Sequence, residues 1–230
     1  MAPGSNAYTD VNTLLEEHAR RRANKIFIES PDQGSRITFG EFEALTRRFA
    51  NVLAAEGVAF GDRISVLSEN AIEALVIFWG ALRAGVIVNP INAEIREKHV
   101  GQILHEVRPK LVFSHRELPG DPLTLVPADT ASIRFGAWNA PSPAADDLFA
   151  RLRTVSDAPV PARPKRGDWS CINYTSGTTD MPKGAIWTHE AYYAMSESPV
   201  DRLEITDADT ILDNIDVNGM LVGSGATNAR

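Results

Sequence analysis

The sequence has a single cysteine, Cys171, and no long uninterrupted apolar run. One thiol excludes an intramolecular disulfide framework and fits a reducing compartment, so we expect a cytoplasmic protein. The longest uncharged apolar stretch, residues 74–82, is about half of the roughly 20 residues that a membrane-spanning helix needs. Residues 1–10 also lack the apolar core of a secretory signal. We therefore expect a protein without a membrane span.

An excess of basic residues is absent as well. The formal net charge is −7, from 23 lysines and arginines against 30 aspartates and glutamates. A protein of this charge repels nucleic acid and anionic membrane surfaces, so neither is an expected partner. The five histidines are scattered without metal-ligand spacing, and no metal site is predicted within the chain. With 43% hydrophobic residues, the chain has the composition of an ordinary globular protein.

Helical and strand patterns alternate along the first half of the chain. The predicted helices cover residues 11–22, the segment from Thr38 to Gly57, and residues 71–84 and 94–107. The predicted strands cover residues 25–29, 36–39, 63–68, 86–91 and 110–114. Strands separated by helices of this length imply crossover connections. The predicted fold class is therefore α/β, with parallel-rich sheets flanked by helices.

The middle of the sequence is rich in proline and carries weaker patterns. Two short strands are predicted, at residues 123–126 and 132–138. Residues 157–167 read DAPVPARPKRG, which predicts a surface connector. We place a boundary there, with an N-terminal α/β subdomain over residues 1–165 and the start of a second subdomain over residues 166–230.

A hydroxyl-rich loop follows the apolar segment at residues 169–174. Five residues, Thr-Ser-Gly-Thr-Thr at 175–179, precede Lys183 and Gly184. Nucleotide phosphates need backbone N–H groups that approach closely, short hydroxyl donors and a cation. Gly177 has no Cβ to obstruct that approach, and Lys183 supplies a compact positive charge. The loop therefore has the composition of a phosphate-binding loop.

The composition of this loop also fits a simple turn between two strands. The loop does not match the Walker A pattern, because no Gly-Lys-Ser/Thr triplet stands at the required interval. It also lacks the G-x-S-x-G nucleophile elbow. The order of its residues decides between the two readings. Residues 174–184, Tyr-Thr-Ser-Gly-Thr-Thr-x-x-Pro-Lys-Gly, resemble the phosphate-loop motif of the adenylate-forming superfamily.

That superfamily comprises acyl- and aryl-CoA synthetases, peptide-synthetase adenylation domains and luciferases. Three further segments, residues 37–42, 82–92 and 183–189, are similar to its sequence patterns. The resemblance implies the N-terminal part of the adenylate-forming fold. It also implies a two-step reaction, in which a carboxylic acid reacts with ATP to form an acyl-adenylate. A thiol, that of CoA or of a carrier protein, then takes the acyl group.

The resemblance implies which residues bind ATP and which contributions lie elsewhere. The implied phosphate-binding residues are Thr175, Ser176, Gly177, Thr178, Thr179, Lys183 and Gly184. Mg²⁺ is implied as a second cofactor, with its ligand residues outside this chain. No catalytic residue is assigned. The loop is expected to be mobile before ATP arrives.

The sequence departs from the family pattern in two places. Asp180 stands where the family usually has glycine, and its carboxylate brings negative charge toward the phosphates. The family's enzymes are more than twice as long, so we expect the C-terminal domain to be absent. Residues 213–230 are expected to be poorly ordered or out of register with the family pattern. The isolated chain is then expected to be inactive. Two alternatives are a non-catalytic nucleotide-binding module and a subunit of a split enzyme that needs a partner chain.

Overall fold

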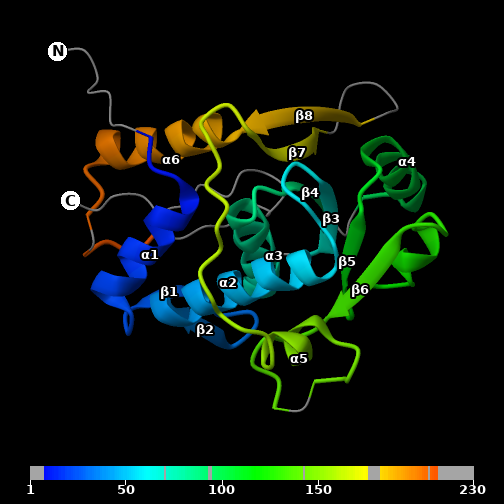
Figure 1. Cartoon of the computed structure of the whole chain (residues 1–230), viewed down its shortest axis with the longest axis horizontal. Helices are drawn as coiled ribbons and strands as arrows, with labels where there is room; N and C mark the ends of the chain where they lie inside the picture. The colour runs from blue at the N-terminus through cyan, green and yellow to red at the C-terminus, as the bar shows by residue number, and fades with distance from the viewer. Residues whose placement is uncertain are drawn as a thin grey trace.

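A computed structural model describes residues 8–69, 71–92, 95–141, 143–175, 182–206 and 208–211. Its main feature is a six-stranded sheet (Figure 1). The strands are β3 (Arg63–Ser68), β4 (Ile87–Asn92), β5 (Leu111–His115), β6 (Ala131–Phe135), β7 (Trp169–Thr175) and β8 (Lys183–Thr188). Their spatial order is β6-β5-β3-β4-β7-β8, and every neighbouring pair is parallel except β7 and β8. The predicted α/β class with a parallel-rich sheet is confirmed.

Helices cover both faces of this sheet (Figure 1). They are α1 (Val11–Arg22), α2 (Phe39–Ala55), α3 (Ile72–Arg83), α4 (Glu97–Val107), α5 (Leu148–Leu152) and α6 (His189–Leu203). Alternate side chains of β3 separate two apolar clusters: Val66 packs with α2 and α3, whereas Leu67 packs with α4. No helix within the described ranges is long and apolar enough to cross a membrane.

Local signals explain the best-predicted helix boundaries. Helix α2 begins with a capping box, in which the Thr38 hydroxyl accepts from the Glu41 N–H and the Glu41 carboxylate accepts from the Thr38 N–H. The helix ends before Gly57, whose φ is 70°. Gly85 follows α3 with φ 69°. Both glycines adopt the left-handed conformation that closes a helix without steric cost.

The middle of the chain corrects two predictions. The strand predicted at residues 123–126 is wrong, because Pro122–Leu125 forms a short 3₁₀ helix, η1. The Asp121 carboxylate accepts from the Leu123 N–H and so caps this turn locally. The strand predicted at residues 132–138 exists as β6 but ends at Phe135. Helix α5 was not predicted. The first hairpin, β1 (Ile26–Ser30) with β2 (Ser35–Thr38), lies within one residue of its predicted bounds.

The predicted connector crosses the molecule as an extended strap, defined here as residues 156–168 (Figure 1). Most of it is exposed, but Val160 and Pro164 are buried. Side chains of α1, of α2 and of the segment before α1 hold it through its backbone carbonyls. The bonds run from Asn51 to Ser156 and Ala158, from Asn12 to Ala162, and from Tyr8 to Pro164. The strap leads to β7, which joins the same sheet as the strands within residues 63–135. The boundary near residue 165 stays a prediction.

One buried cation joins the three N-terminal helices. The Arg83 side chain, at the end of α3, is fully buried. Its guanidinium donates to Asn12 Oδ1 at 2.8 Å, Thr46 Oγ1 at 3.0 Å and Glu43 Oε1 at 3.1 Å. Burial lowers the pKa of Arg83, and the Glu43 carboxylate opposes that change. Because Asn12 also donates to the carbonyl of Ala162, the same cluster holds the strap.

Candidate phosphate-binding site

The predicted phosphate-binding loop connects β7 to β8. Strand β7 joins the parallel part of the sheet through Cys171, which pairs with Val88 of β4, and β8 returns antiparallel. The Cys171 thiol is buried, as predicted for a core position, and burial raises its pKa to about 12. The hairpin therefore stands on a rigid base of sheet. The carboxyl ends of β3, β4, β5 and β7 lie at one edge, where α/β sheets bind ligands.

The ends of the loop are in place, while its centre lies outside the described residues. Backbone pairing joins Thr175 to Lys183 and Tyr174 to Gly184, so these four residues form the two stems of the loop. The predicted phosphate-binding residues Ser176, Gly177, Thr178 and Thr179 fall outside the described part of the chain, as does Asp180. The structure thus brings Thr175, Lys183 and Gly184 together.

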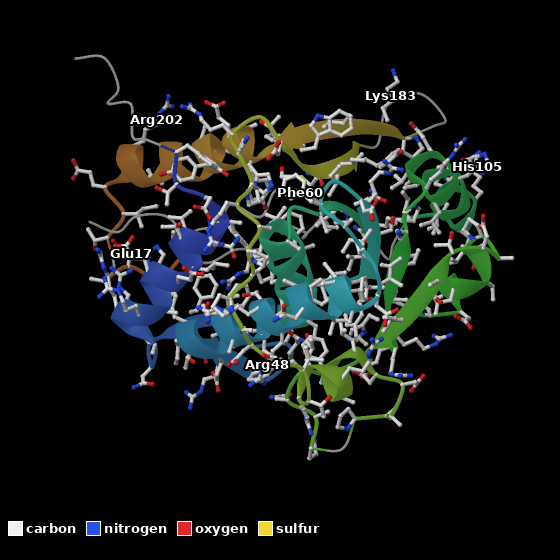
Figure 2. The ribbon with its side chains drawn as sticks, viewed as in Figure 1. Glu17, Arg48, Phe60, His105, Lys183 and Arg202 are labelled. Carbon is white, nitrogen blue, oxygen red and sulfur yellow. The ribbon has the colours of Figure 1, made fainter. Side chains whose placement is uncertain are left out.

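Lys183 is the cation of the predicted site. Its side chain is exposed, and the structure gives it no ion pair with another described residue. Figure 2 shows Lys183 pointing away from the body of the protein at the outer end of β8. An exposed ammonium with no carboxylate partner among the described residues is available for an anion. A purely structural lysine in a turn would be expected to lie in a salt bridge.

Gly184 is required by space rather than by backbone conformation. A Cβ at this position would lie 3.1 Å from Cζ of Tyr174 and 3.2 Å from Cγ2 of Ile172. Contacts of this length are tighter than nine in ten real Cβ contacts, so the Tyr174 ring or the Ile172 side chain would have to move by a few tenths of an ångström. The glycine of the motif therefore lets a tyrosine ring from β7 lie across β8.

Tyr174 was part of the quoted motif but not of the predicted site. Its ring packs against the apolar cluster under α4, and its phenol lies beside Glu106 of that helix. Burial raises the pKa of Tyr174, and the negative charge of Glu106 raises it further. The phenol therefore stays protonated and can donate. The alternation of side chains along β7 could have indicated the position of Tyr174, because it places Ile172 and Tyr174 on one face of the strand.

Ser68 is a second polar residue at this edge that the sequence reasoning missed. It ends β3, is 5% exposed, and its Oγ has no partner among the described residues. Only the parallel order of the strands brings it to the edge where β7 ends. Nothing in its local sequence distinguishes it from any other serine after a strand.

The donor chemistry at the stems fits the phosphates of ATP. The stems offer an exposed ammonium at Lys183. Among the described residues, no three or more histidine, cysteine, aspartate or glutamate side chains lie together so that they could hold a metal ion. Mg²⁺ is therefore not assigned to any described residue. What the described stems can do is present the Lys183 cation to an anion.

Residues 15–213 match the family model described as AMP-binding enzyme. The chain belongs to this family. The match covers the helices α2 to α6, every described strand and the predicted phosphate loop. The description names a nucleotide, and the phosphate-binding role of the hairpin stays a prediction.

Named relatives of the chain agree with this assignment. A long-chain-fatty-acid–CoA ligase, FadD13, of Mycobacterium tuberculosis is 33% identical over 189 residues, which are 79% of this chain and 35% of the relative. A 4-hydroxybenzoate–CoA/benzoate–CoA ligase of Rhodopseudomonas palustris is 28% identical over 196 residues, 84% of this chain and 35% of the relative. The chain spans about a third of the length of these curated relatives.

A solved structure shows the same architecture. The inhibitor-bound crystal structure of the N-terminal domain of FACL13 from Mycobacterium tuberculosis matches with a TM-score of 0.79 and 26% sequence identity. The match covers 95% of this chain and 54% of that one. The fold therefore corresponds to part of the N-terminal domain of an AMP-binding enzyme, as the sequence resemblance implied.

Proposed function

We propose that this chain is the N-terminal, phosphate-binding part of an ATP-dependent ligase that activates a carboxylic acid. The observation that carries the proposal is the exposed Lys183 ammonium, held by backbone pairing opposite Thr175 at the base of the loop. Family membership and the named CoA ligases among the relatives support it. The cytoplasm is the proposed location, since it supplies ATP and keeps Cys171 reduced.

In the proposed reaction, a carboxylate oxygen of the acid attacks the α-phosphorus of ATP. The bond from that phosphorus to the pyrophosphate oxygen breaks, which yields an acyl-adenylate and pyrophosphate. Negative charge grows on the leaving pyrophosphate as this bond breaks. Lys183, Thr175 and the remaining loop residues 176–179 hold the β- and γ-phosphates and stabilise that charge. Mg²⁺ bound with ATP would neutralise further phosphate charge.

The thiol acceptor is proposed to be CoA, because the two relatives described above are named CoA ligases. A carrier-protein thiol is the other acceptor that the resemblance allows. The chain spans about a third of these relatives, so the remaining active-site groups are proposed to come from further polypeptide or from a partner chain. The isolated chain is accordingly expected to bind nucleotide phosphates without catalysing the formation of an acyl-adenylate.

The proposal is tested by replacing Lys183 with alanine and titrating the chain with Mg·ATP and with pyrophosphate in a calorimeter. Lys183→Ala should weaken binding by about tenfold or more, because a charge-assisted hydrogen bond contributes about 1.5–3 kcal/mol. Its melting temperature without ligand should stay within about 1 °C of wild type, because the lost side chain is exposed.

Lys165→Ala is the matched control, since Lys165 is also exposed but lies in the strap. It should leave both the affinity and the melting temperature unchanged. A Lys183→Ala chain that melts early yet binds pyrophosphate as tightly as wild type would show that Lys183 has a structural role. That result would overturn the proposal.

A further inference from the structure

The two stems of the loop are locked together by one aromatic ring. The Tyr174 ring of β7 lies directly over Gly184 of β8, so close that a Cβ at Gly184 would meet it at 3.1–3.3 Å. The contact spans the pair next to Thr175 and Lys183. Any movement of the ring is therefore transmitted to the residues that present the loop.

The same ring is attached to a helix outside the hairpin. Tyr174 packs on the apolar cluster that includes Ile103, Leu104 and Val107 of α4. Its phenol reaches the Glu106 carboxylate on that helix. In Figure 2, His105 of α4 and Lys183 of β8 mark these two elements on the same side of the molecule. Tyr174 is thus half-buried between α4 and the loop stems.

We propose that Tyr174 is a positioning residue of the phosphate-binding site: it fixes Gly184 and, through the stems, the place of Lys183 opposite Thr175. This inference rests on the proposed function. The ring lies across the two stems, and its packing against α4 beside Glu106 sets the orientation of the ring. Tyr174 does not itself touch the phosphates. It removes freedom from the hairpin before a ligand arrives, so less order has to be imposed on binding.

The experiment compares Tyr174→Phe, which keeps the ring, with Tyr174→Ala, which removes it. Pyrophosphate affinity should fall by about tenfold or more in Tyr174→Ala, because a displacement of about 1 Å in a positioned group has large effects. Tyr174→Phe should retain affinity within about threefold, because the ring that lies over Gly184 is kept. Tyr193→Ala is the matched control and should bind as wild type does. Tyr193 is a half-buried tyrosine of α6 whose ring contacts that of Tyr8.

A second readout does not depend on ligand. Amide hydrogen exchange should rise at residues 183–185 in Tyr174→Ala and stay at the wild-type rate in Tyr174→Phe and Tyr193→Ala. Unchanged exchange at the stems of Tyr174→Ala would overturn the inference, whatever the affinity. If wild type binds no pyrophosphate while exchange rises as expected, the proposed function fails and the ring's hold on the stems stands.

A double substitution separates positioning from a general loss of packing. Gly184→Ala should raise stem exchange in the wild-type background, because the new methyl group collides with the ring. In the Tyr174→Ala background the same methyl group has room on that side, although Ile172 still lies close. The two effects should therefore be strongly non-additive. Additive effects would contradict a direct contact between ring and glycine as the source of the order.

Discussion

His189, the first residue of α6, has a buried imidazole whose charged form is destabilised by the loss of solvent. Its imidazole is 5% exposed, and Nε2 has no partner within the described part of the chain. Burial lowers the pKa of His189 to about 4, although the carboxylates of Asp168 and Asp10 favour the charged form. The ring is therefore neutral in the folded protein at neutral pH. Its backbone N–H donates to the carbonyl of Asp168, which fixes the start of α6 on the strap.

Stability should consequently fall as the pH drops from 6.5 toward 4. In that window the unfolded chain binds a proton on His189 that the folded chain does not, so protonation favours unfolding. The share of His189 in the free energy of unfolding should be about 2 kcal/mol less at pH 5 than at pH 7. Urea denaturation of wild type and His189→Gln at several pH values measures this, and the variant should have the shallower pH dependence.

His105→Gln is the matched control, because His105 is exposed on α4 (Figure 2). Its pH dependence should follow that of wild type. Parallel curves for wild type and His189→Gln would mean that the buried imidazole is not the source of the acid sensitivity.

The helices α1, α2 and α3 meet at Arg83, and their packing depends on that contact. The Arg83 guanidinium donates hydrogen bonds to Asn12 of α1 and to Glu43 and Thr46 of α2. A buried charge is tolerable only when its partners are all present. Helix α3 thus supplies the buried charge, and α1 and α2 supply the acceptors that make its burial tolerable.

Arg83→Ala should lower the free energy of unfolding by about 3 kcal/mol or more, because it leaves buried polar partners without their donor. Arg21→Ala, at an exposed end of α1 with Glu17 as its partner, should cost about 0.5 kcal/mol or less. Chemical denaturation of both variants measures the difference. Equal losses in the two variants would show that the buried network does not hold the helices together.

Sequence patterns identified the elements whose signals are local. Thr38 and Glu41 predict the start of α2 because both partners of the cap lie within one turn. The residues at 123–126 suit a strand by composition, but the Asp121 cap and Pro122 turn them into η1. Arg83 could not be recognised as buried, because its partners lie 37 to 71 residues away.

The candidate site was predictable to the same extent. The motif singled out Lys183 and Gly184 because its residue order is distinctive. Backbone pairing places both at the stems, and their phosphate-binding role stays a prediction. Tyr174 and Ser68 gained their places only from packing against α4 and from strand order, which are not local. The roles assigned to residues 176–179 stay a prediction.

All six strands between residues 63 and 188 belong to a single sheet. The Asn89 amide connects its middle strands, accepting from Ser65 on β3 and donating to the carbonyl of Ile172 on β7. Both bonds are buried and therefore costly to break separately. The sheet is continuous across the strap, where the sequence suggested a boundary near residue 165.

The chain should therefore unfold in a single cooperative transition. Two single-tryptophan variants test this, one that keeps Trp79 in α3 and one that keeps Trp187 in β8, with the other tryptophans replaced by phenylalanine. Their fluorescence midpoints should coincide with each other and with the midpoint seen by far-UV circular dichroism. A clearly earlier transition at Trp187 would instead favour two folding units divided near residue 165.

The way the strap is attached has a consequence for how this protein can diverge over evolutionary time. Its carbonyls accept from Asn51, Asn12 and Tyr8, and a carbonyl is the same in every amino acid. Selection should therefore act on the three donors and leave much of the strap free to drift in sequence. Among natural variants of this gene, exposed strap positions such as Pro161 should change often, while Asn12 and Asn51 persist. Frequent loss of both asparagines alongside an unchanged strap would contradict this expectation.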